Sequence, residues 1–390
     1  MVYIDLTNTK NANCLTGIQR VCLRIHDHFD ECKGIAYDGN FKRWRSLNRG
    51  EIANFKTPTQ NKKNAINKFL RSKWARRFSK KSEALLEADG LIVPELFGLR
   101  EAAAFSDLFK LINGPKVAVF YDAFPLKLIN EHPSRVTQMF PEYLHHLTRF
   151  DGIAAISEYS RDVLVDYWKW AGWKTTPPVE AIPLGIDIPS TVNNKKSLHE
   201  SDCNRLPIIL SVGTLEGRKN HISLFKAAEM LWNEGLKYEL HVIGMKQMQT
   251  ASHAISLMES LISRGRPLHY FGHVKDEDLE SAYIKCDFTV YPSLMEGFGL
   301  PVLESLHRGK PCIFLNNSAL SELVSGGGCL ALSDFKPENL AHAMKQLLFA
   351  RASNAPQNML YSLKDEAIHR PIRNWSHYVN DLQNFMQGLK

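Results

Sequence analysis

The chain of 390 residues has no regularly spaced cysteines. Its seven cysteines are scattered and include no Cys-x-x-Cys pair. An odd, irregular set predicts reduced thiols in a cytosolic protein and argues against a disulfide framework or a zinc ribbon. No run approaches 18 apolar residues and no charged-then-apolar leader opens the sequence, so we expect a protein that is neither secreted nor membrane-spanning.

Several catalytic signatures are also absent. The sequence contains no Gly-x-Ser-x-Gly, His-Glu-x-x-His or Gly-x4-Gly-Lys-Ser/Thr motif, which argues against an esterase, a zinc protease and a P-loop NTPase. Its composition, with 44% hydrophobic and 23% charged residues, is that of an ordinary globular protein and excludes a disordered or coiled-coil chain. The length predicts two domains.

The net charge of +7 is concentrated in one segment. Residues 41–81 hold fourteen Lys or Arg and a single acid, Glu51, for a net charge of +13, which leaves −6 for the other 349 residues. Within this segment Ile66, Leu70 and Trp74 recur at every fourth position. That spacing predicts an apolar stripe on a basic helix over residues 62–81.

Three interpretations of the basic helix remain open. Basic residues around an apolar stripe suit an anionic membrane surface. The same residues could bind nucleic acid. Alternatively, the stripe packs on its own domain and the charges are solvated.

Short apolar strands alternate with helical patterns in both halves of the chain. Such a pattern predicts an α/β protein with parallel sheets, here two Rossmann-like domains that face each other across a ligand cleft. Ser157 is predicted to cap a helix, and the polar stretch 188–205 to link the domains. The expected strands cover residues 2–6, 90–93, 117–121, 153–156, 208–212, 239–243, 268–271, 288–291 and 312–314.

A loop with two glycines follows the expected strand 288–291. Gly297 and Gly299 allow the backbone to approach a ligand closely, and a helix begins just after them. The N–H groups of Phe298, Gly299 and Leu300 therefore predict an anion site suited to a diphosphate.

Two glutamates flank that loop. Glu296 and Glu304 are eight positions apart, and a carboxylate can accept hydrogen bonds from two vicinal hydroxyls. This arrangement predicts a sugar on one side of the diphosphate and a ribose on the other.

Glycines and cations also follow two other strands. Gly213 and Thr214 follow strand 208–212, and Arg218 and Lys219 provide adjacent positive charges for phosphate oxygens. Gly17 stands in the turn after the first strand, where it allows close backbone approach to a substrate.

Together these motifs resemble the GT-B fold glycosyltransferases of family GT4, over most of the chain. The resemblance rests on the Glu-x7-Glu element with its Gly-Phe-Gly loop, on Gly-Thr-Leu-x-x-Arg-Lys-Asn and on the Thr-Gly-Ile start. It implies that Glu296 contacts the transferred sugar, Glu304 contacts the ribose, and Arg218 and Lys219 neutralise the leaving diphosphate. Gly17 would face the same diphosphate.

The resemblance also implies a domain plan. Residues 1–190 would form the acceptor-side domain and residues 206–365 the nucleotide-sugar donor domain. Residues 366–390 would return as a helix onto the first domain. Many members have His-Asp where this chain has Tyr121-Asp122, so Asp122 is a candidate contact for a sugar or acceptor hydroxyl.

The expected activity is that of the bacterial mannosyl- and rhamnosyltransferases of surface polysaccharide synthesis. We expect a retaining enzyme that needs no metal or cofactor and transfers a sugar, first of all mannose from GDP-mannose, to a saccharide or lipid-linked acceptor. It would be cytoplasmic with no nucleic-acid partner, and for residues 62–81 contact with the membrane surface and packing on their own domain both stay open. The alternatives are a nucleotide-sugar epimerase and a non-catalytic polyanion-binding module.

Two motifs that could bind a metal ion are interpreted as ordinary secondary structure. Asp276-Glu277-Asp278 has an Asp-x-Asp form but is typical of acids in the first turn of a helix. His269 and His273 straddle a strand end, and we expect no cysteine or acid to complete a ligand set with them. No metal site is therefore predicted.

Overall fold

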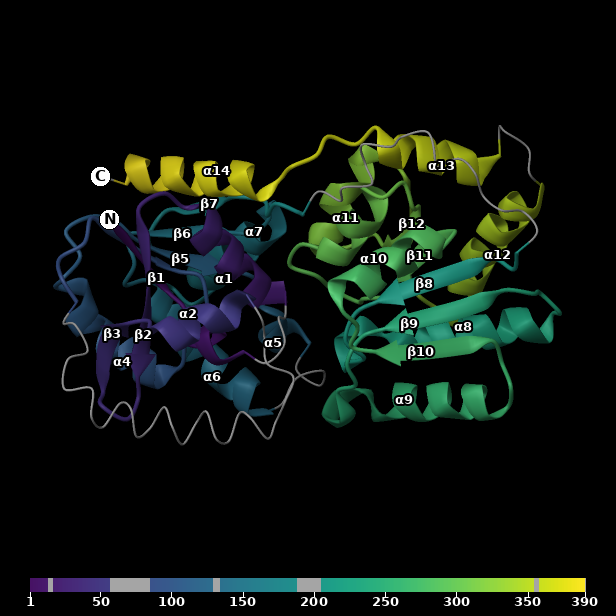
Figure 1. Ribbon diagram of the computed structural model, residues 1–390, viewed down its shortest axis with the longest axis horizontal. Helices are drawn as coiled ribbons and strands as arrows, with labels where there is room; N and C mark the ends of the chain where they lie inside the picture. Colours follow the sequence, from purple (N-terminus) through teal and green to yellow (C-terminus); the bar gives the residue numbers. More distant parts are fainter. Residues whose placement is uncertain (13–16, 57–84, 129–133, 188–204, 354–357, 390) are drawn as a thin grey trace. The chain divides into compact units, whose positions relative to one another are not determined.

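Two separate sheets organise the chain, each within its own unit of the computed structural model (Figure 1). Unit 1 comprises Met1–Tyr121, Met139–Gly185 and Trp375–Lys390, and unit 2 comprises Asp122–Gln138 and Ile186–Asn374. The structure describes residues 1–12, 17–56, 85–128, 134–187, 205–353 and 358–389. The predicted basic helix 62–81 and nearly all of the predicted linker 188–205 lie outside these residues.

The sheet of unit 1 has seven strands in the order β3-β2-β1-β4-β5-β6-β7. All neighbours are parallel except β2 and β3, which are antiparallel. The reversal of strand order after β1 is the Rossmann arrangement. The strands are β1 Val2–Asp5, β2 Cys32–Asp38, β3 Arg43–Ser46, β4 Gly90–Val93, β5 Lys116–Phe120, β6 Gly152–Ala155 and β7 Val179–Ala181.

The C-terminal helix α14 packs in unit 1, although more than a hundred residues of unit 2 precede it. A side chain at Gly90 would place its Cβ 2.9 Å from Met386 Cε, and one at Gly152 would lie 2.8 Å from Phe385 Cζ. Glycine at these two strand starts therefore lets α14 approach the sheet. The helices that precede β8 in the chain, together with α14, are η1 Thr9–Asn11, α1 Gly17–His28, α2 Arg49–Lys56, α4 Leu99–Phe109, α5 Phe124–Lys127, α6 Ser134–Leu147, α7 Glu158–Trp170 and α14 Trp375–Gly388.

The sheet of unit 2 has six parallel strands in the order β10-β9-β8-β11-β12-β13. The order again reverses beside the first strand, β8, so β8 and β11 form the switch point at which Rossmann-like folds bind ligands. The strands are β8 Ile208–Val212, β9 Glu239–Ile243, β10 Leu268–Gly272, β11 Phe288–Tyr291, β12 Cys312–Leu315 and β13 Cys329–Leu332.

Helices cover the sheet of unit 2 on both faces. Apolar residues of α8, α9 and α12 pack with Leu240, Val242 and Leu268 into one large core, while α10 packs on Leu210 on the opposite face. The helices are η5 Gly217–Lys219, α8 His221–Asn233, α9 Met248–Ser263, α10 Asp276–Lys285, α11 Leu300–Leu306, η6 Ser318–Gly326, α12 Pro337–Ser353 and α13 Met359–Ile368.

Every expected strand is present to within one residue at either end, and the fold class is confirmed. Ser157 caps α7, because its Oγ accepts a hydrogen bond of 3.0 Å from Ser160 N. Four strands were not expected, β2, β3, β7 and β13, and all of them lie at or next to the sheet edges. The expected domain 1–190 differs from unit 1, which excludes residues 122–138.

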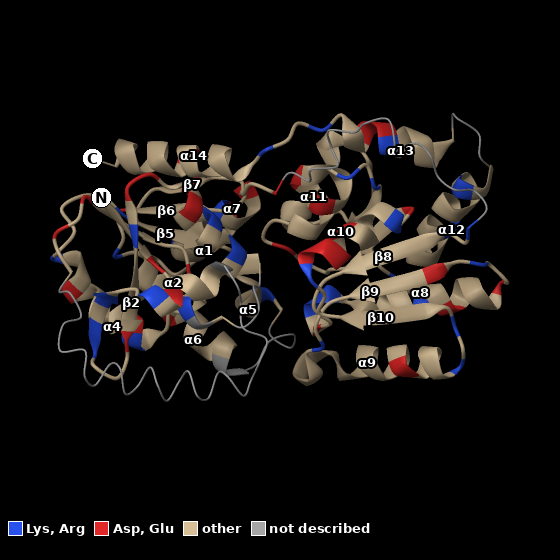
Figure 2. Ribbon diagram, viewed as in Figure 1, with Lys and Arg blue, Asp and Glu red and all other residues tan. Residues whose placement is uncertain are grey.

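One basic residue of the segment 41–81 is buried and ion-paired within unit 1. Arg45 on β3 is buried, and its guanidinium pairs with Glu51 at 2.7 Å and with Asp38 at 3.3 Å. Among the described residues of both units, acidic and basic residues are interspersed along the ribbon (Figure 2). In the described part of the chain no helix is long and apolar enough to cross a membrane.

Candidate functional site

The predicted cations and the first glutamate meet at the switch point of unit 2. The turn η5 that carries Arg218 and Lys219 comes shortly after β8, and the loop that carries Glu296 follows β11. The two strands are hydrogen-bonded neighbours. The backbone joins these segments as well, since Leu294 N donates to Arg218 O at 2.8 Å.

Glu296 is the centre of a buried polar cluster. One carboxylate oxygen, Oε1, lies 2.5 Å from Lys219 Nζ, 3.2 Å from Arg218 Nη1 and 2.9 Å from the hydroxyl of Tyr291. Only 7% of Glu296 and 8% of Lys219 is exposed. Arg218 also pairs with Glu216 at 2.8 Å, so the cluster contains two cations and two anions.

The cluster fixes the protonation of its central carboxylate. Burial alone would raise the pKa of Glu296, but Lys219 and then Arg218 outweigh burial and lower that pKa to about 2. Burial also raises the pKa of Tyr291 well above its ordinary value, so this hydroxyl remains a donor. Glu296 is consequently an ionised hydrogen-bond acceptor throughout the neutral range.

Asp122 belongs to the same unit and the same electrostatic environment. Desolvation raises the pKa of its carboxyl to about 6, against the lowering effect of Arg218. Asp122 Oδ1 accepts a hydrogen bond of 3.2 Å from Phe124 N, and the Arg218 guanidinium lies 5.3 Å from the centre of the Phe124 ring. The four residues predicted as catalytic, Glu296, Arg218, Lys219 and Asp122, are thus brought together.

The glycines shape the backbone around this cluster. Gly299 precedes α11 with φ of +98°, and a Cβ there would lie 2.5 Å from Leu320 Cδ2. No other residue fits that position without strain and a clash. Gly213 follows β8 and lies against Gly244. A Cβ built at Gly244 would lie 1.9 Å from Gly213 O, so the two backbones approach closely. Thr214 lies half-buried in the same turn.

The loop after β11 is tied to the segment after β12. Glu296 N donates to Ser318 Oγ at 3.0 Å, and Asn317 Nδ2 donates to Leu294 O at 2.6 Å. Gly297, Phe298 and Leu300 belong to this loop and to the start of α11. Whether their N–H groups bind a diphosphate stays a prediction.

Glu304, the second predicted glutamate, lies on α11. Its Oε2 accepts a hydrogen bond of 3.2 Å from the hydroxyl of the buried Tyr283 on α10. Arg308 covers the Tyr283 ring at 4.7 Å and donates to Glu304 O at 2.7 Å. Glu304 is therefore half-buried and held in one orientation.

Gly17 begins α1 in unit 1, where a Cβ would meet no atom of the described residues within 4 Å.

Comparisons with known proteins show what the chain is similar to. The family described as glycosyl transferases group 1 matches residues 196–361, which include the Glu296 cluster and Glu304. The O-antigen chain mannosyltransferase B of Escherichia coli is 27% identical over 286 residues, 69% of this chain and 73% of that protein. The chain is a glycosyltransferase, and its match to the group 1 family covers residues 196–361.

Other relatives extend the similarity of this glycosyltransferase to nearly its whole length. The serotype-specific mannosyltransferase WbdA of E. coli is 23% identical over 369 residues, 90% of this chain. The chain spans 43% of the length of that relative. The structure of Anabaena HepE in complex with UDP and glucose superposes with a TM-score of 0.66 at 13% identity, over 99% of each chain. The fold is GT-B.

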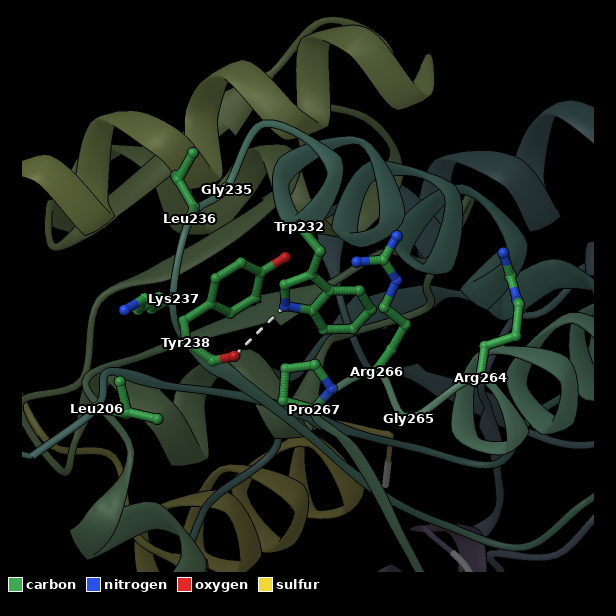
Figure 3. Close-up of a pocket in the computed structure, with 10 residues that line it drawn as sticks. All are labelled: Leu206, Trp232, Gly235, Leu236, Lys237, Tyr238, Arg264, Gly265, Arg266 and Pro267. Atoms are coloured by element: carbon green, nitrogen blue, oxygen red, sulfur yellow. Dashed lines mark hydrogen bonds between the residues drawn. The ribbon is translucent and has the colours of Figure 1, made fainter.

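A pocket of about 580 Å³ in unit 2 of the glycosyltransferase lies at the other end of the sheet (Figure 3). Leu206, Tyr238 and Pro267 line it just before β8, β9 and β10, whereas the Glu296 cluster follows the carboxyl ends of strands. Trp232 stacks on Tyr238 at 5.4 Å and donates to its carbonyl at 3.3 Å. None of the described residues that line this pocket carries a carboxylate, so it does not compete as the candidate site.

The residues that hold the site of this glycosyltransferase in place were not predicted from the sequence. Tyr291 was recognised only as a strand end, and Tyr283 and Ser318 carried no signal because their partners are distant in sequence. His221 was also missed. It is buried beside Lys219 with neither ring nitrogen hydrogen-bonded to any described residue, and burial, followed by Lys219, lowers its pKa to about 3.

The prediction that no acid completes a ligand set with His269 and His273 stays untested, although one acid lies near His269. Glu239 Oε2 lies 3.8 Å from His269 Nε2, so an acid does stand beside this histidine. The acid comes from the neighbouring strand, β9, rather than from the sequence around His273. The acids of Asp276-Glu277-Asp278 lie in the first turn of α10, as expected.

Proposed function

We propose that this glycosyltransferase transfers mannose from GDP-mannose to a saccharide or lipid-linked acceptor, with retention of configuration and without a metal ion. The buried cluster of Glu296, Lys219 and Arg218 at the switch point of unit 2 carries the proposal. The donor sugar is chosen because both E. coli relatives are named as mannosyltransferases.

Lys219 and Arg218 neutralise the leaving diphosphate in this proposal. When the bond between sugar and diphosphate breaks, negative charge develops on the phosphate oxygens and positive charge on the sugar ring. Two cations already held in position stabilise the phosphate charge without reorganisation. They supply the positive charge that a divalent ion provides in other phosphate chemistry, which supports a metal-independent reaction.

Glu296 is the proposed contact for the transferred sugar. Its pKa of about 2 keeps it an acceptor for sugar hydroxyls, and its negative charge favours the positive sugar ring of the transition state. Glu304 would accept hydrogen bonds from the ribose of the donor, because Tyr283 orients its carboxylate. Asp122, with a pKa of about 6, would accept from a sugar or acceptor hydroxyl.

Retention would follow from attack on the same face that the diphosphate leaves. A donor phosphate oxygen would take the proton of the acceptor hydroxyl, so no separate protein base is required. A double displacement would instead need a carboxylate nucleophile and a second carboxyl group about 5–5.5 Å away. In the cluster, one oxygen of Glu296, Oε1, already binds two cations and Tyr291, which disfavours Glu296 as that nucleophile.

The acceptor and the membrane complete the proposal. A lipid-linked acceptor would place the enzyme at the cytoplasmic membrane surface, with residues 62–81 in contact with anionic lipid. Flotation with anionic liposomes tests this part. Neutralising the bases of 62–81 should remove a salt-sensitive association, and an unchanged association would contradict it.

A donor panel tests the main proposal. The EDTA-treated enzyme is incubated with GDP-mannose, GDP-fucose, UDP-glucose or dTDP-rhamnose and a mannose-terminated acceptor, and the product is examined by NMR. We expect an α-linked mannosyl product from GDP-mannose alone. Transfer from another donor would change the assigned sugar, a β-linkage would contradict retention, and activity only after addition of metal would contradict metal independence.

A further inference from the structure

Three potential metal ligands meet on the sheet of unit 2, away from the candidate active site. His241 on β9 is in register with His269 on the parallel edge strand β10, and Glu239 precedes His241 by two residues. His241 Nε2 lies 2.7 Å from Glu239 Oε2, and His269 Nε2 lies 3.8 Å from the same oxygen. One ligand atom from each residue falls within a span of 4.8 Å.

The three side chains share the face of the sheet opposite α8, α9 and α12, which is also the face on which α10 packs against Leu210 of β8. Leu240, Val242 and Leu268 point into the core beneath those helices. Because strand side chains alternate, Glu239, His241 and His269 point to the opposite face. The side chain of His269 is 49% exposed, whereas that of His241 is 17% exposed. An ion from solution can therefore reach ligands that are already partly fixed.

We propose that Glu239, His241 and His269 form a binding site for a divalent transition metal of the zinc type. Two imidazoles and one carboxylate are a common three-ligand set for Zn²⁺ and leave a fourth position for water. Ligand atoms around a tetrahedral Zn²⁺ stand roughly 3.4 Å apart, given bonds of about 2.0–2.1 Å. The observed separations bracket that value, so small side-chain rotations would close the site.

The position of the site assigns it a role outside sugar transfer. Its ligands lie within β9 and β10, whereas the Glu296 cluster follows the carboxyl ends of β8 and β11. A bound ion would join the edge strand β10 to its neighbour. An ion that binds only the folded state raises apparent stability, so the expected effect is a more stable unit 2.

Titration of the metal-free full-length protein with Zn²⁺ alone tests the site. Isothermal titration should give one ion per chain, and Co²⁺ in its place should give the strong visible absorption of tetrahedral coordination. His269→Ala should weaken Zn²⁺ binding at least tenfold and remove the rise in Tm that Zn²⁺ produces. His253→Ala is the matched control, because this exposed histidine lies on α9 and outside the set.

Each other outcome would overturn the proposal. Zn²⁺ binding that is equal in wild type, His269→Ala and His253→Ala would place the ion elsewhere on the chain. The lack of saturable binding would show that the three residues form only a hydrogen-bonded surface group. Glu239→Gln provides a second variant of nearly the same shape and should weaken binding in the same way if the site exists. These readouts do not require activity, so they are independent of the proposed function.

Discussion

Lys219 Nζ lies 2.5 Å from Glu296 Oε1, although the two residues are 77 positions apart in the chain. The pairing follows from the sheet, because β8 and β11 are adjacent and the segments that follow them meet at one edge. Both residues are nearly buried, so the pair forms in a region from which water is largely excluded. A buried ion pair of this kind is expensive to break from one side.

The first prediction concerns the stability of this pair. Glu296→Leu leaves the buried Lys219 without its closest anion and should lower the free energy of unfolding by about 3 kcal/mol. The double variant Lys219→Met/Glu296→Leu should recover most of this loss, because an apolar pair of similar volume needs no partner. Urea denaturation of Glu296→Leu, Lys219→Met and the double variant measures the coupling free energy between the two residues.

Transfer activity of the same variants distinguishes a catalytic role of the pair from a purely structural one. The double variant should remain without transfer activity despite its restored stability, since neither a phosphate cation nor a sugar acceptor is present at these positions. An active double variant would show that the pair is structural only. Purely additive losses of stability would show that the two charges are not coupled.

A second prediction concerns Tyr283 as a positioning residue for Glu304. Tyr283→Phe removes the 3.2 Å hydrogen bond to Glu304 Oε2 but leaves the aromatic packing in place. The donor KM should rise about fivefold with little change in kcat, because roughly 1 kcal/mol of orientation is lost. Steady-state kinetics with varied donor concentration measures this split.

Tyr238→Phe is the matched control for Tyr283→Phe. The Tyr238 hydroxyl donates to Ala228 O at 3.1 Å and lies beside the pocket of Figure 3, at the amino ends of the strands. This control should lose some stability and keep the wild-type KM. An unchanged KM in Tyr283→Phe, or an equal change in both variants, would remove the positioning role.

A third prediction uses the left-handed backbone before α11. Gly299→Ala must adopt φ of +98° and also places a methyl group 2.5 Å from Leu320 Cδ2. We expect a loss of about 2 kcal/mol or more in the free energy of unfolding and a clear loss of donor binding. Gly265→Ala has a similar positive φ of +74° with open space around it, and should cost only about 1 kcal/mol. Equal costs would show that the close approach to Leu320 is relieved by repacking.

A fourth prediction concerns the dependence of stability on pH. The pKa of His221 is lowered from 6.5 to about 3 in the folded protein, so the unfolded chain binds the proton more tightly. Its contribution to stability is therefore complete above pH 6.5 and decreases as the pH falls towards 3. At pH 5.5 the loss should be about 1.4 kcal/mol relative to pH 8.

His221→Leu isolates this contribution from that of the other ionisable groups. The difference in free energy of unfolding between wild type and variant should change by about 1.4 kcal/mol between pH 8 and 5.5, in favour of the variant at the lower pH. His253→Leu, at an exposed position on α9, is the control for the substitution itself. A pH-independent difference for His221→Leu would mean that the imidazole gains a proton in the folded state.

The sequence predicted most of the fold because its central strands are continuous apolar runs between helical patterns. The four unexpected strands are edge strands or their neighbours, and β2 and β3 carry polar residues such as Lys33 and Arg43 that weaken the apolar pattern. An edge strand is stabilised by one neighbour only, and that neighbour is not visible in the local sequence.

The candidate site was predictable where its residues are adjacent in sequence and not where strand register creates it. Glu296, Arg218 and Lys219 occur in short motifs, and the structure brings them into contact. Tyr283 reaches Glu304 only because α10 packs beside α11. Likewise, His241 and His269 become neighbours through the register of β9 and β10, which fixes a pairing of residues 28 positions apart.

The division of labour between the two glutamates is the central claim, and the kinetics of Glu296→Ala and Glu304→Ala test it most directly. Glu277→Ala, an exposed acid on α10, serves as the control. With GDP-mannose varied, Glu296→Ala should lower kcat about 100-fold with a small change in KM, and Glu304→Ala should raise KM about tenfold with a small change in kcat. Wild-type kinetics for both folded variants, or the same change in both, would contradict the assignment of the site.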